Sequence, residues 1–384
     1  MNELTANKPT VRPVVFCYGI FVSLMLFQTS FLRLGTITAL AALVLIFLAF
    51  FVELSKKNCI HWSFEPMLLL IFALLCFGGA AIHPPMPSYA LPMLAQMLVC
   101  IALYTIDLTP KEHRFLKQVF IWATVVYSVL IIYSCLVQGE DRYVHGQIIL
   151  FNTELDPNYI GIPLVAAMTL LLSAIVHEKR KLLSVLCYGI VAVAMMFTSS
   201  RGNFLATVLA SVIYVLFLIF NPKISQGKKI LFTLILTVVA IGVFLIASRY
   251  LAEQWERMSE FGAGSDHGRF DLWKQSIDQW SKKPFLGHGL GGMFRIIGKA
   301  SHNTYLQILS ETGLVGLLLF VPFLLIQLGR AFRCDKDMFV VMVGMLFQIL
   351  FLDALDSRCV WVVLIWVSML PKRYSKEEEN YLKQ

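Results

Sequence analysis

The sequence predicts an all-α, polytopic integral membrane protein with about twelve transmembrane helices. Hydrophobic residues make up 58% of the 384 residues and charged residues only 15%, and the mean hydropathy is +0.72. Apolar runs repeatedly reach the ~18–20 residues that a helix needs to cross a bilayer. Lysines and arginines are concentrated in alternate loops. Together these observations exclude a soluble fold and put most of the chain in a membrane.

The predicted spans follow one another with short loops between most of them. Turn and charge signals are clearest at Asn221-Pro222 and Lys228-Lys229, which separate the eighth span from the ninth. The last apolar segment is too short to cross a bilayer unless it tilts or packs among neighbouring helices. The twelve segments are 14–32, 36–53, 65–82, 88–105, 115–136, 158–176, 182–199, 203–220, 230–248, 304–329, 338–354 and 358–370.

Basic residues distinguish the two sides of the membrane. Lys56-Lys57, Lys179-Arg180-Lys181 and Lys228-Lys229 fall in alternate loops, whereas the short loops between these carry single arginines. Because positively charged loops stay in the cytoplasm, both termini are expected there. The net charge of +8 follows from this bias and does not indicate a nucleic-acid partner. The chain then divides into helices one to nine (1–248), a large extracytoplasmic loop (249–303), helices ten to twelve (304–370) and a cytoplasmic tail (371–384).

The loop 249–303 is polar, but its pattern predicts a folded segment. Phe270, Trp273, Ile277 and Trp280 recur at helical spacing, so residues 269–281 should form an amphipathic helix that ends before the proline at 284. Two tryptophans on one face favour a position at the membrane surface. The glycine-rich run 287–292 lacks the preceding strand and the GK[ST] ending of a phosphate-binding loop, which favours a flexible turn.

A polar stripe enters the tenth span directly after this loop. Asn303, Gln307 and Glu311 are spaced four residues apart on one face of an otherwise apolar helix, with His302 at its outer end. Polar side chains at that depth must face protein or a water-filled cavity. Interhelical hydrogen bonding is the alternative interpretation, and it is favoured for Gln307. His302 is the candidate catalytic residue, because an imidazole can take up a proton near neutral pH.

Several arginines are predicted on the same outer side as His302. Arg201 lies in a tight turn between two apolar spans, and Arg269 opens the loop helix, where a cation opposes the helix dipole. The rigid guanidinium fork suits a diphosphate. Snorkelling or salt bridging would explain each arginine alone. Together with Arg142 and Arg358, they predict an anion-binding site.

Four segments carry recognisable motifs. They are Thr198-Ser199-Ser200-Arg201-Gly202, Gly268-Arg269-Phe270-Asp271-Leu272-Trp273, Pro284-Phe285-Leu286-Gly287-His288-Gly289, and a His-Asn pair followed after nine residues by Gly313-x-x-Gly316. In these segments the chain resembles the bacterial O-antigen ligase and O-antigen polymerase superfamily, most specifically between about 156 and 320. Close approach of a neighbouring helix is the purely structural interpretation of Gly313 and Gly316.

The resemblance implies a GT-C-like fold and an inverting glycosyltransferase that takes a glycan from undecaprenyl diphosphate. In the family pattern, the arginines that correspond to Arg201 and Arg269 hold the donor diphosphate, and the histidine that corresponds to His302 activates the acceptor hydroxyl. Fixed guanidinium groups would stabilise the charge that develops on the leaving diphosphate. No metal, cofactor or nucleotide sugar is implied. Candidates for supporting roles are Asn303, Glu311, Arg358 and Arg142.

Two acceptors fit the same mechanism. A ligase, which the complete histidine signature favours, would use lipid A core, and a polymerase would use a second lipid-linked glycan. Asp156-Pro157-Asn158-Tyr159 resembles a polymerase stretch, although Asp before Pro is also an ordinary helix start. Either enzyme would lie in the bacterial inner membrane, in contact with membrane lipid, with its active site facing the periplasm.

A transporter or flippase would share the twelve-span pattern. Such proteins tend to have two related halves and ionisable residues near the bilayer midplane, and neither feature is evident here. The sequence also lacks an Asp-rich metal pair and the HExxH and CxxC motifs. Asp353 and Asp356 lie near Arg358 in the sequence and are candidates either for its salt-bridge partners or for catalysts; the structural role is favoured. Convergence of Arg201, Arg269 and His302 on one cavity would favour the enzyme.

Overall fold

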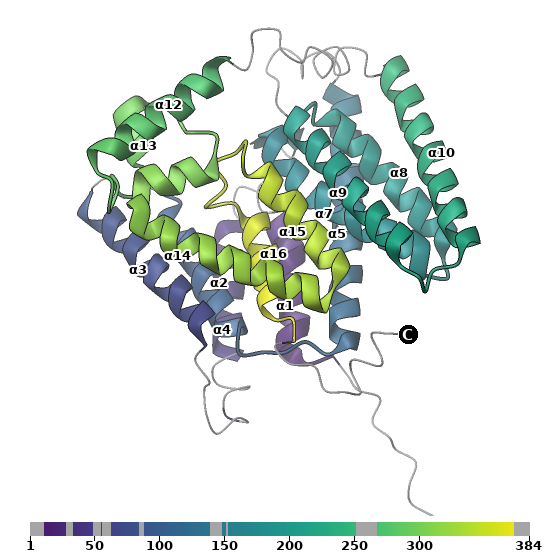
Figure 1. Cartoon of the computed structure of the whole chain (residues 1–384), viewed down its shortest axis with the longest axis horizontal. Coiled ribbons are helices and arrows are strands. Elements are labelled where there is room, and N and C mark those ends of the chain that lie inside the picture. Colours follow the sequence, from purple (N-terminus) through teal and green to yellow (C-terminus); the bar gives the residue numbers. More distant parts are fainter. Residues whose placement is uncertain are drawn as a thin grey trace, which may run out of the picture.

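The structure of the protein is a computed structural model, which describes residues 11–27, 34–48, 55, 63–83, 88–138, 148–150, 153–250 and 267–371. These residues are almost entirely helical (Figure 1). One antiparallel hairpin, formed by β1 (Ile148–Leu150) and β2 (Thr153–Leu155), is the only sheet in this part of the chain. The prediction of an all-α membrane protein is confirmed.

Each of the twelve predicted apolar segments overlaps a helix, and the predicted loop helix corresponds to α12. The helices are α1 (Pro13–Phe27), α2 (Leu34–Phe47), α3 (Phe64–Ile82), α4 (Ala90–Leu103), α5 (Pro110–Gln138), α7 (Pro157–His177), α8 (Lys181–Phe197), α9 (Arg201–Phe220), α10 (Gln226–Tyr250), α12 (His267–Lys282), α13 (Gly292–Ile297), α14 (Thr304–Cys334), α15 (Lys336–Gln348) and α16 (Arg358–Ser368).

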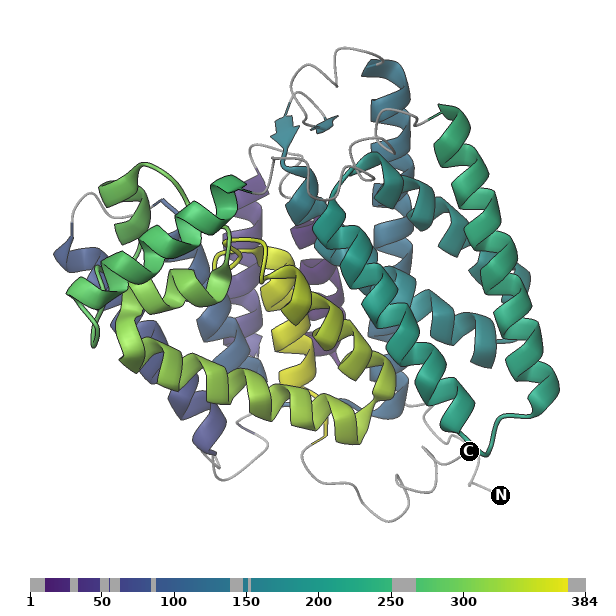
Figure 2. The same ribbon diagram turned by 45° about the horizontal axis from the view of Figure 1, so that its top comes forward.

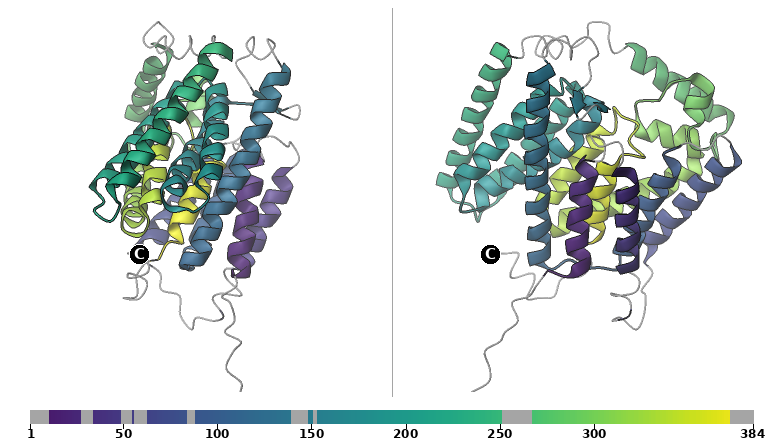
Figure 3. Two further views of the ribbon diagram at one scale, coloured as in Figure 1. Left: turned by 90° about the vertical axis from the view of Figure 1, so that its right-hand side faces the viewer. Right: turned by 180° about the vertical axis from the view of Figure 1, so that it is seen from behind.

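Five helices within the described ranges are long and apolar enough to cross a membrane, namely α3, α5, α7, α9 and α14. They differ in what surrounds them. The apolar part of α7 is 89% buried within the protein, whereas that of α9 is 28% buried, so α7 is enclosed by other helices and α9 is peripheral. Helices α1, α2 and α5 form the back of the bundle (Figure 3), and α14 and α15 lie at its front (Figure 1). The number of spans stays a prediction.

Helix α16 lies in the middle of the bundle (Figure 1). Its residues from Val360 to Ser368 are all buried, and it packs against α1, α4, α7, α14 and α15. Its 11 residues extend about 16 Å, roughly half the thickness of a bilayer core. A helix that is apolar on every side is stable when other helices surround it. Packing among neighbours therefore explains the short last segment.

Helix α14 is broken at Gly313, where φ is 68° and ψ is −167°, and the resulting bend is visible in Figure 2. The segment before α13 supplies hydrogen bonds at the break. Leu314 N donates to Pro284 O at 2.8 Å, and Gly289 N donates to Glu311 O at 2.8 Å. The glycine-rich turn is therefore packed against α14. The amide of Gly289 is already engaged, and so is that of His288, which donates to Ser310 O, so neither is free to bind a phosphate.

Candidate functional site

Arg201 and Arg269 line the same pocket. The other lining residues are Gly202 and Leu205 of α9, Phe270 and Trp273 of α12, and Phe351 of the loop between α15 and α16. The pocket has a volume of 130 Å³, well below the ~300–1,000 Å³ of sites that enclose a drug-sized ligand. It can accommodate a small group, such as a diphosphate, but not a whole glycan.

The start of α9, which carries Arg201, is fixed against the start of α7. Ser200 caps α9, and its hydroxyl donates to Asn158 Oδ1 at 2.7 Å. Asn203, which is 1% exposed, occupies the space beside Gly161, where an added Cβ would lie 1.8 Å from Asn203 Nδ2. Glycine at 161 is therefore required for this contact. These interactions explain the polar residues Ser200 and Asn203 on either side of Arg201.

The chemistry of the pocket suits an anion. Among the described residues, its lining has two guanidinium groups and no carboxylate. Both arginines lie in the first turn of a helix, where unpaired backbone N–H groups add partial positive charge. Trp273 Nε1 is buried and has no hydrogen-bond partner among the described residues. Leaving a buried donor unsatisfied costs about 1–3 kcal/mol. An anion bound to the arginines could accept this hydrogen bond as well.

His302 lies on a strained loop next to this pocket. Its φ is 51°, in the left-handed region that costs a residue other than glycine about 1–3 kcal/mol. The buried carboxylate of Asp353 stabilises the loop. It accepts from His302 N at 2.8 Å and from Asn303 N at 3.4 Å, and it also accepts from Ser301 Oγ. Asp353 therefore has a structural role, with backbone amides some 50 residues upstream in the sequence as its partners; no salt bridge between Asp353 and Arg358 is found among the described residues.

Phe351 and Asp353 connect the two parts of the site. Phe351 lines the arginine pocket, and its ring centroid is 6.5 Å from that of Trp273. Two residues later, Asp353 binds the backbone of His302. The structure thus brings Arg201 and Arg269 together and holds the histidine loop beside them, although His302 itself does not line the pocket.

The residues predicted to support the site do not lie together. Asn303 caps α14, and its Oδ1 accepts from Tyr305 N and Leu306 N, so capping explains this residue. Glu311 is 3% exposed and lines another cavity of 300 Å³, with His83. Arg142 lies outside the described residues, as does the part of the predicted loop from 251 to 266.

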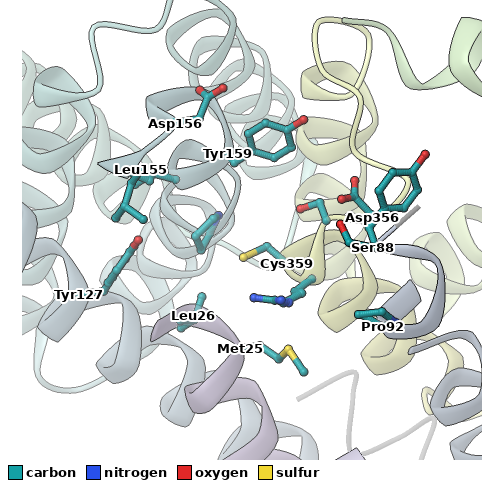
Figure 4. Close-up of a pocket in the computed structure, with 15 residues that line it drawn as sticks. Met25, Leu26, Ser88, Pro92, Tyr127, Leu155, Asp156, Tyr159, Asp356 and Cys359 are labelled. Atoms are coloured by element: carbon teal, nitrogen blue, oxygen red, sulfur yellow. The ribbon is translucent and has the colours of Figure 1, made fainter. Parts of the chain in front are cut away.

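Arg358 lines a larger cavity of 430 Å³ beside the histidine loop (Figure 4). Asp356, Tyr89 and Tyr159 also line it. Neither tyrosine was predicted from the sequence to be a site residue. Tyr159 lies in the Asp156-Pro157-Asn158-Tyr159 stretch, which was a usable signal. Tyr89 follows no motif, and only the tertiary fold brings it here.

The chain is similar to known proteins of two descriptions. A family described as O-antigen ligase matches residues 186–321. The chain is also 22% identical over 294 residues to a protein named O-antigen polymerase from Salmonella muenchen, covering 69% of this chain and 73% of that protein. Together, these matches support the O-antigen ligase and polymerase superfamily. The resemblance predicted from the sequence is confirmed. The superfamily match contains Arg201, Arg269 and His302, whereas Asp353 and Arg358 lie beyond it.

The buried carboxyl of Asp356 should make the stability of the folded protein depend on pH. Burial raises the pKa of this loop carboxyl from 3.8 to about 6, and the nearby charge of Asp353 contributes in the same direction. A raised pKa in the folded state means that folding favours the protonated form. The contribution to stability is therefore complete below about pH 4 and is lost as the pH rises through 6. Between pH 4 and 7, the melting temperature of Asp356→Asn should fall less than that of the unmodified protein. Parallel melting curves across this range would contradict the assignment.

Proposed function

We propose that the protein is a glycosyltransferase of cell-surface polysaccharide synthesis that transfers a glycan from undecaprenyl diphosphate to a sugar hydroxyl of an acceptor. The convergence of Arg201 and Arg269 on one small pocket carries this proposal. Convergence of Arg201, Arg269 and His302 on one cavity was expected of an enzyme rather than of a twelve-span transporter or flippase, and two of these three residues line one pocket. The pocket size suits the diphosphate, while the lipid chain and the glycan extend beyond it.

In the proposed reaction, the acceptor hydroxyl attacks the anomeric carbon of the donor sugar from the side opposite the diphosphate. The new carbon–oxygen bond forms as the bond to the diphosphate breaks, and the configuration inverts. His302 accepts the hydroxyl proton. Arg201 and Arg269 stabilise the negative charge that develops on the departing diphosphate. No step requires a metal ion.

Helix α12 would position the donor at the membrane surface. Leu272 and Ser276 face the protein and are buried, whereas Phe270 is 63% exposed and Ile277 is 48% exposed. Exposed apolar residues on a surface helix are suited to the lipid interface. We propose that the polyprenyl chain stays in the bilayer while its diphosphate enters the arginine pocket from this side.

The protein would lie in the bacterial inner membrane with twelve spans, a GT-C-like architecture and both termini in the cytoplasm. The loop 249–303 and the pocket would face the periplasm. The distribution of lysine and arginine between the loops supports this orientation.

We propose a ligase that uses lipid A core as its acceptor, with a repeat-unit polymerase as the alternative. The complete histidine signature and the description of the matching family favour the ligase. The name of the Salmonella relative favours the polymerase.

Reconstitution of the purified protein tests both activities. Proteoliposomes that contain undecaprenyl-diphosphate glycan would receive either lipid A core or additional donor. Glycan attached to the core indicates a ligase, and a ladder of chain lengths indicates a polymerase. His302→Ala should abolish either product. His177→Ala should retain it, because His177 is at the end of α7 that lies away from the site. Equal transfer by His302→Ala and the unmodified protein would refute the catalytic role of His302.

Asp353→Ala should reduce the rate of glycan transfer because it displaces His302. This substitution removes the acceptor for two backbone amides and one hydroxyl, so the strained histidine loop should relax. Displacement of a catalytic group by ~1 Å can cost about 10²-fold in rate. We expect a loss of this order in kcat, with little change in donor KM, and a smaller loss for Asp353→Asn, which keeps one acceptor oxygen. An unchanged kcat in Asp353→Ala would show that the loop does not depend on this carboxylate.

A further inference from the structure

The 430 Å³ cavity beside the histidine loop differs in character from the arginine pocket. Among the described residues, its polar side chains come from four places that are distant in the sequence: Ser88 and Tyr89 before α4, Tyr127 of α5, Asp156 and Tyr159 at the start of α7, and Asp356, Ser357 and Arg358 at the start of α16. Asp156 and Tyr159 lie across the cavity from Asp356 and Ser88 (Figure 4). From this geometry we infer that the cavity binds the sugar of the acceptor, an inference that rests on the proposed function.

The charges of the cavity select against the diphosphate. In the part of the chain that the structure describes, two carboxylates and one guanidinium line it, whereas the arginine pocket has two guanidinium groups and no carboxylate. A diphosphate would be repelled by Asp156 and Asp356. A neutral polyhydroxylated ligand fits both charges, because each hydroxyl can donate to a carboxylate and accept from a guanidinium.

The remaining surface suits a saccharide ring. Met25 and Leu26 lie at the end of the cavity opposite Asp156 (Figure 4), and Pro92, Ile160 and Pro163 complete an apolar surface. The C–H faces of a sugar can pack on such a surface while its hydroxyls reach the polar side chains. The volume lies within the ~300–1,000 Å³ typical of small-molecule sites, which combine apolar walls with a few polar groups.

The cavity and the histidine loop share a wall. Tyr159 OH donates to Asp353 O at 2.7 Å, and the carboxylate of Asp353 binds His302 N. The loop between α15 and α16 therefore contributes Phe351 to the arginine pocket, Asp353 to the support of His302, and Asp356 to this cavity. An acceptor sugar held here lies on one side of the histidine loop, and the donor diphosphate lies on the other.

Substitutions in the cavity should weaken acceptor binding selectively. Asp356→Asn and Arg358→Gln each remove a charged partner of a hydroxyl, so the acceptor KM should rise by about 10–100-fold, while the donor KM stays within about twofold. Tyr89→Phe removes a single hydroxyl and should give a smaller rise, and it remains informative if a charge substitution impairs folding. Arg180→Gln, at the opposite end of the molecule, is the matched control and should behave as the unmodified protein.

Direct binding separates this inference from the proposed function. The probes are lipid-free core oligosaccharide and delipidated repeat unit, observed by saturation-transfer NMR with detergent-purified protein. Arg201→Ala should still bind one of the two, and Arg358→Gln should lose it. If Asp356→Asn and Arg358→Gln both keep normal oligosaccharide binding and a normal acceptor KM, the inference is overturned while the transfer reaction stays intact. If the unmodified protein transfers no glycan, yet Arg358→Gln alone loses oligosaccharide binding, the transfer reaction fails and the sugar site stands.

Discussion

Replacing Arg201 or Arg269 with alanine should lower the rate of glycan transfer by about 10²–10³-fold. Each guanidinium would stabilise charge that develops only as the diphosphate leaves, and removal of one such donor typically costs about 2.7–4 kcal/mol. Lysine at either position should restore part of the rate, because it keeps the charge but loses the bidentate fork. Initial rates with saturating donor and acceptor, at equal amounts of folded protein, measure this effect.

Controls identify the cause of the loss. Arg180→Ala removes an arginine at the opposite end of the molecule and should transfer at the normal rate. The double variant Arg201→Ala with Arg269→Ala should lose less than the product of the two single losses, because residues that act on one group are not additive. Near-normal rates in both single variants would eliminate the arginine pocket as the donor site.

Gly313→Ala is expected to have the largest effect on folding. The residue has a φ of +68°, and an added Cβ would lie 2.2 Å from Phe285 O, a backbone atom that cannot move aside without disrupting the hydrogen bonds at the break in α14. Substitutions that combine backbone strain with overpacking are among those that cost about 4 kcal/mol or more. The variant should therefore yield little monodisperse protein in detergent.

The same helix offers a matched control. A Cβ at Gly329 would meet no atom within 4 Å, so Gly329→Ala should be neutral or slightly stabilising, since alanine is the better helix former. Detergent size-exclusion profiles and melting temperatures of the two variants test the difference. Equal yields and equal melting temperatures would show that α14 can straighten at residue 313.

The helices could be predicted because hydropathy and loop charge are local properties of the sequence. Each apolar segment overlaps a helix, and the periodicity of Phe270, Trp273 and Ile277 predicted α12. The break in α14 could not be predicted. It depends on hydrogen bonds between residues 284–289 and 310–315, which form only in the folded chain. Gly313 was interpreted as a contact between helices, whereas a loop occupies the space.

The candidate site could be predicted where a residue conflicted with its local surroundings. Arg201 between two apolar spans and Arg269 at a helix start were both unfavourable unless an anion was present, and the two line one pocket. Asp353 had no such conflict. Its proximity to Arg358 in the sequence suggested a salt bridge, but its carboxylate binds the histidine loop. Proximity along a chain does not reveal contacts between distant loops.

Donor binding tests the central claim most directly. The affinity of the purified protein for undecaprenyl diphosphate would be compared with that for undecaprenyl monophosphate, using the unmodified protein, Arg201→Ala, Arg269→Ala and Trp273→Phe. We expect the unmodified protein to prefer the diphosphate, each arginine variant to lose most of this preference, and Trp273→Phe to lose part of it through the missing indole N–H. Equal affinity of the unmodified protein for both lipids, or a preference that survives in both arginine variants, would contradict the account.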